Sequence, residues 1–141
     1  MKNLLAGKKV SVRTDGQNGE IFSLLEKHIV GARQVLVEPG LKIYQLPDGT
    51  ILELYGVGSH YPPNIFKNSN MVLSLRVAEL KDALLQLVSS GAKLIGNVED
   101  VTKNYAYCHI QLTDGTILGL YQENNNKENS KMADSRFLSE G

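Results

Sequence analysis

The amino-acid sequence predicts an α+β fold made of two tandem βαβββ modules. Two observations lead to this prediction. A segment of eleven residues occurs twice, at 45–55 (QLPDGTILELY) and at 111–121 (QLTDGTILGLY), with nine identical positions. The hydrophobic patterns before each copy also come in the same order. A repeat with a period of about 60 residues indicates that each copy is a whole structural unit.

The repeat begins well before the duplicated segment. Its further matches are 10–13 (VSVR) with 73–76 (LSLR), Leu24-Leu25 with Leu84-Leu85, and 31–33 (GAR) with 91–93 (GAK). The offset between matching residues changes along the chain, so we expect small insertions in loops.

The second copy shows the pattern of each element more clearly. Residues 71–77 alternate between apolar and polar side chains, which is typical of a half-buried strand. The next apolar residues recur at helical spacing on one face, and Gly91 follows as the expected end of that helix. These residues are Leu80, Ala83, Leu84, Leu87 and Val88. Strands are predicted at 92–98 and 105–112, and Asp114-Gly115 turns the chain into a fourth strand.

The first copy follows the same plan. A first strand around residues 10–13 precedes a helix predicted from about residue 20 to 30, with Ile21, Leu25 and Ile29 facing inward and Gly31 ending it. Strands follow at 33–37 and 41–46, and Asp48-Gly49 turns the chain into the fourth.

The predicted organisation is one domain, 1–122, with a tail. Its parts are module one at 8–56, a linker at 57–70 that contains Pro62-Pro63, module two at 71–122, and a polar C-terminal tail at 123–141. We interpret the tail as loosely held, and the alternative is that Met132, Phe137 and Leu138 dock it onto the body or a partner.

Composition excludes several classes of function. Fifteen basic and fifteen acidic residues give a net charge of zero, without the basic block that nucleic-acid binding requires. The sequence has no apolar run of 18 residues, and residues 1–5 are too short an apolar start for a signal peptide, so we expect no membrane association. A single cysteine, Cys108, excludes an internal disulfide and suits a cytoplasmic protein.

The duplicated module resembles the vicinal oxygen chelate superfamily, which includes glyoxalase I, bleomycin-resistance proteins and extradiol dioxygenases. The resemblance covers about residues 8–122 and depends on the order, spacing and duplication of the motifs DGTILEL and LSLRV. It implies that the two modules pair so that their mixed sheets curve around a central cavity.

Enzymes of this superfamily place metal ligands on the first and fourth strands of each module. The resemblance puts these positions at Lys9, Val72, Glu53 and Gly119, of which only Glu53 is a plausible ligand. A catalytic divalent metal generally needs about three protein ligands. We therefore expect no metal and no other cofactor.

Strand alternation divides the side chains between two faces. The set expected to pack on the helices comprises Val10, Val12, Leu52, Leu54, Leu73, Leu75, Ala106, Cys108, Ile110, Leu112, Leu118 and Leu120. The set expected to face the cavity comprises Ser11, Arg13, Ile51, Glu53, Tyr55, Ser74, Arg76, Tyr105, Tyr107, His109, Gln111, Ile117, Gly119 and Tyr121. A three-residue hairpin loop places His109 opposite Gly119, whereas a two-residue loop places Ile110 there.

Candidate site residues come from the cavity set. Glu53 and His109 are the catalytic candidates. The candidate ligand-binding residues are Ser11, Arg13, Tyr55, Ser74, Arg76, Tyr107, Gln111 and Tyr121. Glu53 is expected to interact with Arg13 or Arg76, either as a structural ion pair or as part of a site. The linker residues His60 and Tyr61 are further candidates for the cavity rim.

Two functions fit this pattern. The first is a metal-free protein of the bleomycin-resistance type that sequesters an organic ligand. The second is a lyase, isomerase or dioxygenase-like enzyme that uses Glu53 and His109, with or without a divalent metal. Because modules of this kind also pair across subunits, and two-fold dimers are common, we expect a homodimer.

Overall fold

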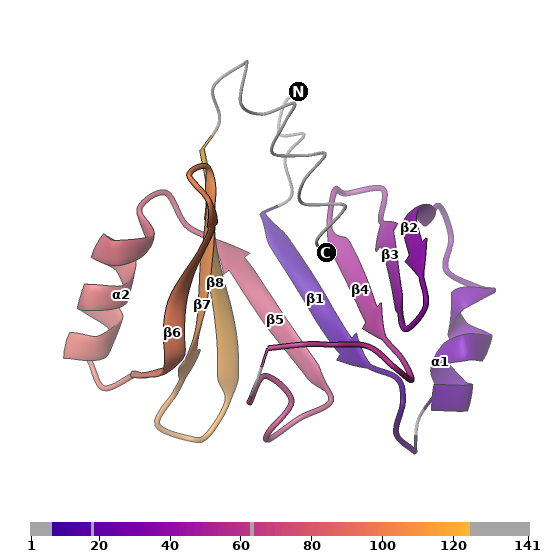
Figure 1. Cartoon of the computed structure of the whole chain (residues 1–141), viewed down its shortest axis with the longest axis horizontal. Helices are drawn as coiled ribbons and strands as arrows, with labels where there is room; N and C mark the ends of the chain where they lie inside the picture. Colours follow the sequence, from indigo (N-terminus) through magenta and orange to yellow (C-terminus); the bar gives the residue numbers. More distant parts are fainter. Residues whose placement is uncertain (1–6, 18, 63, 125–141) are drawn as a thin grey trace.

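The computed structural model describes residues 7–17, 19–62 and 64–124. Ten elements follow one another (Figure 1): β1 (Lys8–Arg13), α1 (Gly19–Glu26), β2 (Arg33–Glu38), β3 (Leu41–Gln45), β4 (Ile51–Tyr55), β5 (Met71–Arg76), α2 (Leu80–Ser89), β6 (Lys93–Thr102), β7 (Tyr105–Gln111) and β8 (Ile117–Glu123). The chain therefore runs twice through strand, helix and three strands. The predicted α+β class and element order are confirmed.

All eight strands form one mixed sheet in the order β2-β3-β4-β1-β5-β8-β7-β6. The first half of this order is repeated, in reverse, by the second half. Within each half the first strand pairs in parallel with the fourth, as β1 with β4 and β5 with β8. The halves join where β1 and β5 pair antiparallel. Figure 1 shows α1 and α2 at opposite outer sides of the sheet, so both helices leave its inner face free.

The strand register places the two copies in equivalent positions. Glu53 lies opposite Ser11 on one side and Ile43 on the other. Gly119 occupies the same place in the second half, opposite Ser74 and His109. The hairpin register with His109 facing Gly119 is therefore the one that forms.

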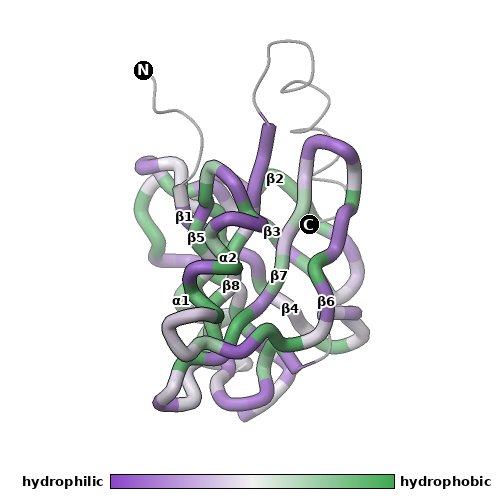
Figure 2. The backbone as a smooth tube through the Cα atoms, turned by 90° about the vertical axis from the view of Figure 1, so that its left-hand side faces the viewer, coloured by the Kyte–Doolittle hydropathy of each residue, from purple (hydrophilic) through white to green (hydrophobic). Residues whose placement is uncertain are grey.

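The helix-facing core of module two contains the predicted apolar residues. Leu80 of α2 packs with Cys108 and Ile110 of β7 and with Leu120 of β8, all buried. Partly buried side chains surround this cluster, among them Leu84, Ala106, Leu112 and Leu118. Figure 2 shows the underlying alternation of hydrophobic and hydrophilic residues as changes between green and purple along the chain. The period-2 assignment of faces is correct for β7 and β8.

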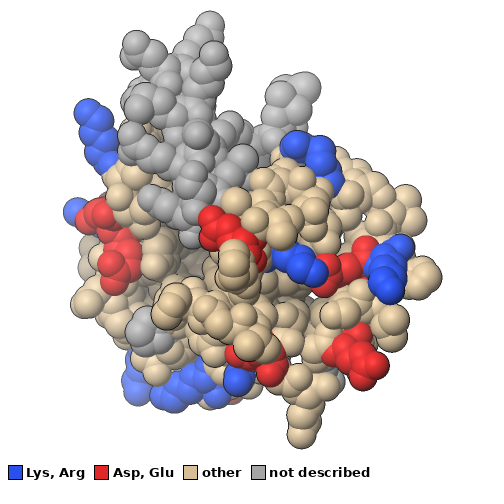
Figure 3. Space-filling model, turned by 45° about the vertical axis from the view of Figure 1, so that its right-hand side comes forward, with Lys and Arg blue, Asp and Glu red and all other residues tan. Residues whose placement is uncertain are grey.

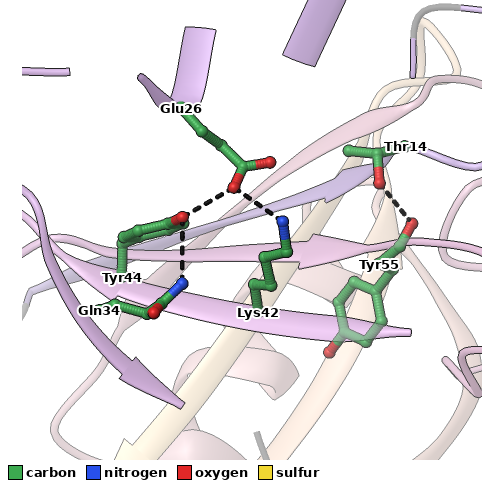
Figure 4. Close-up of polar contacts among 6 residues, drawn as sticks. All are labelled: Thr14, Glu26, Gln34, Lys42, Tyr44 and Tyr55. Carbon is green, nitrogen blue, oxygen red and sulfur yellow. Dashed lines mark hydrogen bonds and ion pairs between the residues drawn. The ribbon is translucent and has the colours of Figure 1, made fainter. Parts of the chain in front are cut away.

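Helix α1 packs less closely than predicted. It ends at Glu26 rather than near residue 30, and none of its side chains is buried. Its end is fastened by polar contacts instead, because Glu26 accepts hydrogen bonds from Tyr44 at 2.7 Å and from Lys42 at 3.0 Å (Figure 4). On the central strand β5, the prediction that Leu73 and Leu75 pack on the helices is wrong, because both side chains alternate with the cavity residue Ser74 but stay exposed.

The connection between the modules closes part of the inner face. Ile65 and Phe66 are buried there against Tyr55, Val72 and Ile117, which come from β4, β5 and β8. The linker is thus part of the core as well as a connection.

The molecular surface carries both charges. Acidic and basic side chains lie interspersed in Figure 3, in keeping with a net charge of zero. In the described part of the chain, neither helix is long and apolar enough to cross a membrane. Residues 125–141 of the tail, including Met132, Phe137 and Leu138, lie outside the described residues.

Candidate functional site

A cavity of about 380 Å³ opens on the inner face of the sheet. Both modules contribute to its wall, because β1 and β4 supply one side and β5, β7 and β8 supply the other. The polar and aromatic residues of the wall are Lys9, Ser11, Glu53, Tyr55, His60, Tyr61, Ser74, Tyr105, Tyr107, His109 and Tyr121. A cavity of this size, mostly aromatic with a few polar groups, is typical of small-molecule sites.

Module one supplies a buried carboxylate. Glu53 is 3% exposed, and its Oε1 accepts hydrogen bonds from the Ser11 hydroxyl at 2.9 Å and the Tyr55 hydroxyl at 3.1 Å. The other oxygen, Oε2, lies 3.7 Å from the ammonium nitrogen of Lys9. Because a buried charge is costly without partners, these contacts explain how the carboxylate is kept inside the fold.

Lys9 is surrounded by tyrosines of module two. Its ammonium donates a hydrogen bond to the Tyr105 hydroxyl at 2.9 Å and lies 5.6 Å and 5.2 Å from the ring centres of Tyr105 and Tyr121. Burial by itself lowers the pKa of Lys9, but the Glu53 carboxylate and the Tyr105 hydroxyl outweigh that effect and raise the pKa above its usual value. Lys9 is therefore a stable cation.

Tyrosine rings from both modules and the linker line the cavity. Tyr105 lies next to Tyr107 and Tyr121 on the adjacent strands β7 and β8, with ring centres 6.2 Å apart in each case. On the opposite side, the rings of Tyr55 and Tyr61 pack edge to face, with their centres 5.8 Å apart. Burial is the main cause that raises the pKa of Tyr121 to about 12, and burial followed by the Glu53 charge raises that of Tyr55. These phenols therefore stay protonated at neutral pH.

Module two supplies a neutral imidazole where module one has Ile43. Burial, followed by the positive charge of Lys9, lowers the pKa of His109 to about 4. Its ring lies 5.8 Å from that of Tyr107. Because Gly119 has no side chain, Ser74 and His109 fill the space beside its Cα atom. A Cβ on Gly119 would lie 2.1 Å from Ser74 Oγ and 3.3 Å from His109 Cδ2.

Seven of the ten predicted site residues line the cavity. They are Ser11, Glu53, Tyr55, Ser74, Tyr107, His109 and Tyr121. The other three lie outside it. Arg13, at the end of β1, pairs with Asp15, while Arg76 donates to the backbone carbonyl of Glu123 at 2.9 Å and Gln111 points toward the hairpin turn at Gly115.

The predicted ion pair between Glu53 and an arginine is wrong. Arg13 and Arg76 lie near strand ends, where their long side chains reach partners outside the cavity. Lys9 lines the cavity and takes the role of cation. Alternation with Ser11 on β1 is the sequence signal for the place of Lys9 on that face. Tyr105 has the same kind of signal, and both residues line the cavity in addition to the predicted candidates.

The residues of this site do not fit a divalent metal. Within residues 7–17, 19–62 and 64–124, no three His, Cys, Asp or Glu side chains lie close enough together to hold an ion. At the one buried carboxylate, Glu53, the neighbouring charge is the ammonium of Lys9. A second cation bound to the same carboxylate would be repelled by this ammonium.

Comparison with solved structures confirms the fold. Methylmalonyl-CoA epimerase from Mycobacterium tuberculosis superposes with a TM-score of 0.58 at 17% identity, over 86% of this chain and 91% of the other. A glyoxalase/bleomycin resistance protein/dioxygenase superfamily member from Vibrio splendidus gives 0.56 at 13%, over 82% and 97%. A glyoxalase I variant from Zea mays gives 0.56 at 20%, over 87% of this chain and 46% of the longer one. No protein-family model matches the sequence, and no curated protein matches it.

Proposed function

We propose, from the premise that this chain has the fold of the glyoxalase/bleomycin resistance protein/dioxygenase superfamily, that it binds a small, flat organic molecule without a metal ion. The observation that carries this proposal is the cavity of about 380 Å³, in which tyrosine rings from both modules face a buried ion pair. Aromatic walls favour flat ligands through stacking and edge contacts. The polar groups fix the orientation of the ligand.

The proposal is tested by ligand binding with a pair of tyrosine variants. The protein is purified without metal and screened by thermal shift against small aromatic compounds, and hits are measured by calorimetry. Tyr107→Ala removes a ring from the cavity wall, whereas Tyr44→Ala removes one that contacts Glu26 on the outer side of the sheet. We expect Tyr107→Ala to weaken binding about tenfold and Tyr44→Ala to leave it unchanged.

Two results would contradict the proposal. One is the absence of any hit in a broad aromatic screen. The other is equal binding by wild type and Tyr107→Ala, which would place the bound molecule elsewhere.

An enzymatic function is the second candidate, and the position of Glu53 favours it. A carboxylate held in a cavity by two hydroxyl groups is suitably placed to take a proton from a bound molecule. His109 is the weaker candidate, because a pKa of about 4 makes it a poor base at neutral pH. We place binding first, because the cavity and its tyrosine rings support it directly, whereas catalysis also requires a substrate with a proton beside Glu53.

Hydrogen exchange distinguishes binding from catalysis. The ketone 1-indanone has exchangeable protons next to its carbonyl group, and NMR in D₂O follows their replacement by deuterium. Faster exchange with wild type than with Glu53→Gln, at matched saturation, would establish Glu53 as a base. Equal rates would leave binding as the function.

We further propose that the chain forms a homodimer. Several large apolar side chains stay exposed on α1, namely Ile21, Leu24 and Leu25, and apolar surface of this kind often marks a protein interface. Light scattering at micromolar concentration should give twice the chain mass of 15.5 kDa. A single species of the chain mass would contradict this proposal.

A further inference from the structure

We propose that the ammonium of Lys9 binds the carbonyl oxygen of a neutral ligand. This inference rests on the proposed binding function and names the class of ligand.

The first step is the geometry at Glu53. A divalent metal bound to a carboxylate lies about 2 Å from its oxygen. The Lys9 nitrogen lies 3.7 Å from Oε2, so the ammonium already takes the side of the carboxylate that faces the cavity. At 3.7 Å the contact is an ion pair and is longer than a usual hydrogen bond. At this distance the charge of Glu53 stabilises that of Lys9.

The second step is how firmly Lys9 is placed. The Lys9 side chain is 12% exposed, and its hydrogen bond to Tyr105 and its position over the rings of Tyr105 and Tyr121 fix the ammonium in the cavity. Ring centres within about 6 Å of a cation attract it. Because the cation is positioned before a ligand arrives, little ordering is needed when the ligand binds.

The third step is the charge of the ligand. Lys9 and Glu53 carry opposite charges, and burial keeps His109 neutral. An anionic ligand would add an uncompensated charge to the buried pair, and a cationic ligand would be repelled by Lys9. A neutral molecule with a strong hydrogen-bond acceptor avoids both costs. A carbonyl group on a flat ring fits the ammonium and the tyrosine wall together.

The test compares 1-indanone with indane, which has the same ring system without the carbonyl group. Binding of each is measured by calorimetry to wild type, to Lys9→Met and to the matched control Lys8→Met. Lys8 is the preceding residue of β1 and pairs with Asp48 outside the cavity. We expect Lys9→Met to weaken 1-indanone about tenfold and indane less than twofold, and Lys8→Met to change neither.

A second pair of variants serves as the test if Lys9→Met is too unstable to be measured. The double variant Lys9→Met/Glu53→Gln removes both charges, and its reference is Glu53→Gln alone. The same tenfold loss, restricted to 1-indanone, is expected in this pair. In wild type the ¹³C resonance of the carbonyl group should also move downfield on binding, as donation to its oxygen requires, and this movement should be absent in the double variant.

Three outcomes would overturn the proposal in different ways. An equal loss for both compounds would show that Lys9 only supports the shape of the cavity. Benzoate binding more tightly than 1-indanone, with the preference lost in Lys9→Met, would make the ligand an anion. Failure of wild type to bind 1-indanone while other aromatic compounds bind would overturn this inference alone, and failure in the whole aromatic screen would overturn the proposed function with it.

Discussion

Ser74 occupies the space that a side chain on Gly119 would need. A Cβ atom on Gly119 would lie 2.1 Å from Ser74 Oγ and 2.9 Å from Ser74 Cβ. In the equivalent pair of module one, Ser11 instead donates a hydrogen bond to the side chain of Glu53. The same strand position therefore holds a carboxylate in one module, whereas in the other a serine from the neighbouring strand fills the space.

This relationship predicts the effect of filling the glycine. We expect Gly119→Ala to lower the free energy of unfolding by about 1–3 kcal/mol, because the new methyl group collides with Ser74 and approaches His109. The double variant Ser74→Gly/Gly119→Ala removes the colliding atoms and should recover most of that loss. Urea unfolding of the single and double variants checks this, and equal stabilities for the two would contradict it.

The buried pair of Lys9 and Glu53 predicts strong coupling between two substitutions. Either Lys9→Met or Glu53→Gln leaves one charge buried without its counterpart, which costs about 3–5 kcal/mol. We expect the double variant to be more stable than either single one. A double-mutant cycle measured by denaturant unfolding gives the coupling energy, and simple additivity would show that the charges are independent.

His109 predicts a specific loss of stability in acid. Its pKa is about 4 in the folded protein against 6.5 for a free histidine, and burial is the main cause. Above pH 6.5 both states are neutral and His109 contributes nothing. Between pH 6.5 and 4 the unfolded chain binds a proton that the folded chain does not, so the free energy of unfolding falls by up to about 3 kcal/mol.

The control for this pH effect is His109→Gln, which cannot gain a proton. Chemical denaturation at pH 7.5 and at pH 4.5 should show a larger loss for wild type than for this variant. The same loss in both proteins would mean that other groups cause the acid sensitivity.

The burial of Phe66 predicts that the linker stabilises both the fold and the cavity. Its side chain is buried against Tyr55, and Phe66→Ala should cost about 3 kcal/mol or more through the space it leaves. Phe22→Ala in α1 is the matched control, because no side chain of that helix is buried. The midpoint temperature of thermal unfolding and the ligand affinity should both fall in Phe66→Ala and stay unchanged in Phe22→Ala. A larger effect at Phe22 would contradict the assignment of Phe66 to the core.

The fold was predictable because the same order of strand and helix patterns occurs twice in the sequence. The alternation in 105–112 placed Cys108 and Ile110 in the core and His109 on the inner face. The partner of Glu53 was not predictable in this way. Alternation assigns each residue to a face of the sheet, but it does not predict which partner a long side chain reaches. The side chain of Arg13 pairs with Asp15, and that of Lys9 pairs with Glu53.

The prediction for helix α1 was wrong for a different reason. The apolar spacing of Ile21 and Leu25 predicted an inward face, yet both side chains are more than two-fifths exposed. Spacing shows that residues share one side of a helix, but not that another surface covers that side. The fastening of the helix by Glu26 depends on Lys42 and Tyr44 of β3, a tertiary contact without a local signal.

The antiparallel pairing of β1 with β5 has a consequence for how the chain is made. β1 is the first strand among the described residues, but one of its edges is completed only by residues 71–76, far later in the sequence. Its other edge pairs with β4, also a distant partner. During synthesis, β1 therefore keeps an open edge until β5 has left the ribosome. Such non-local pairings close late and slow folding, so the emerging first half carries a temporary risk of self-association that ends when the second half arrives.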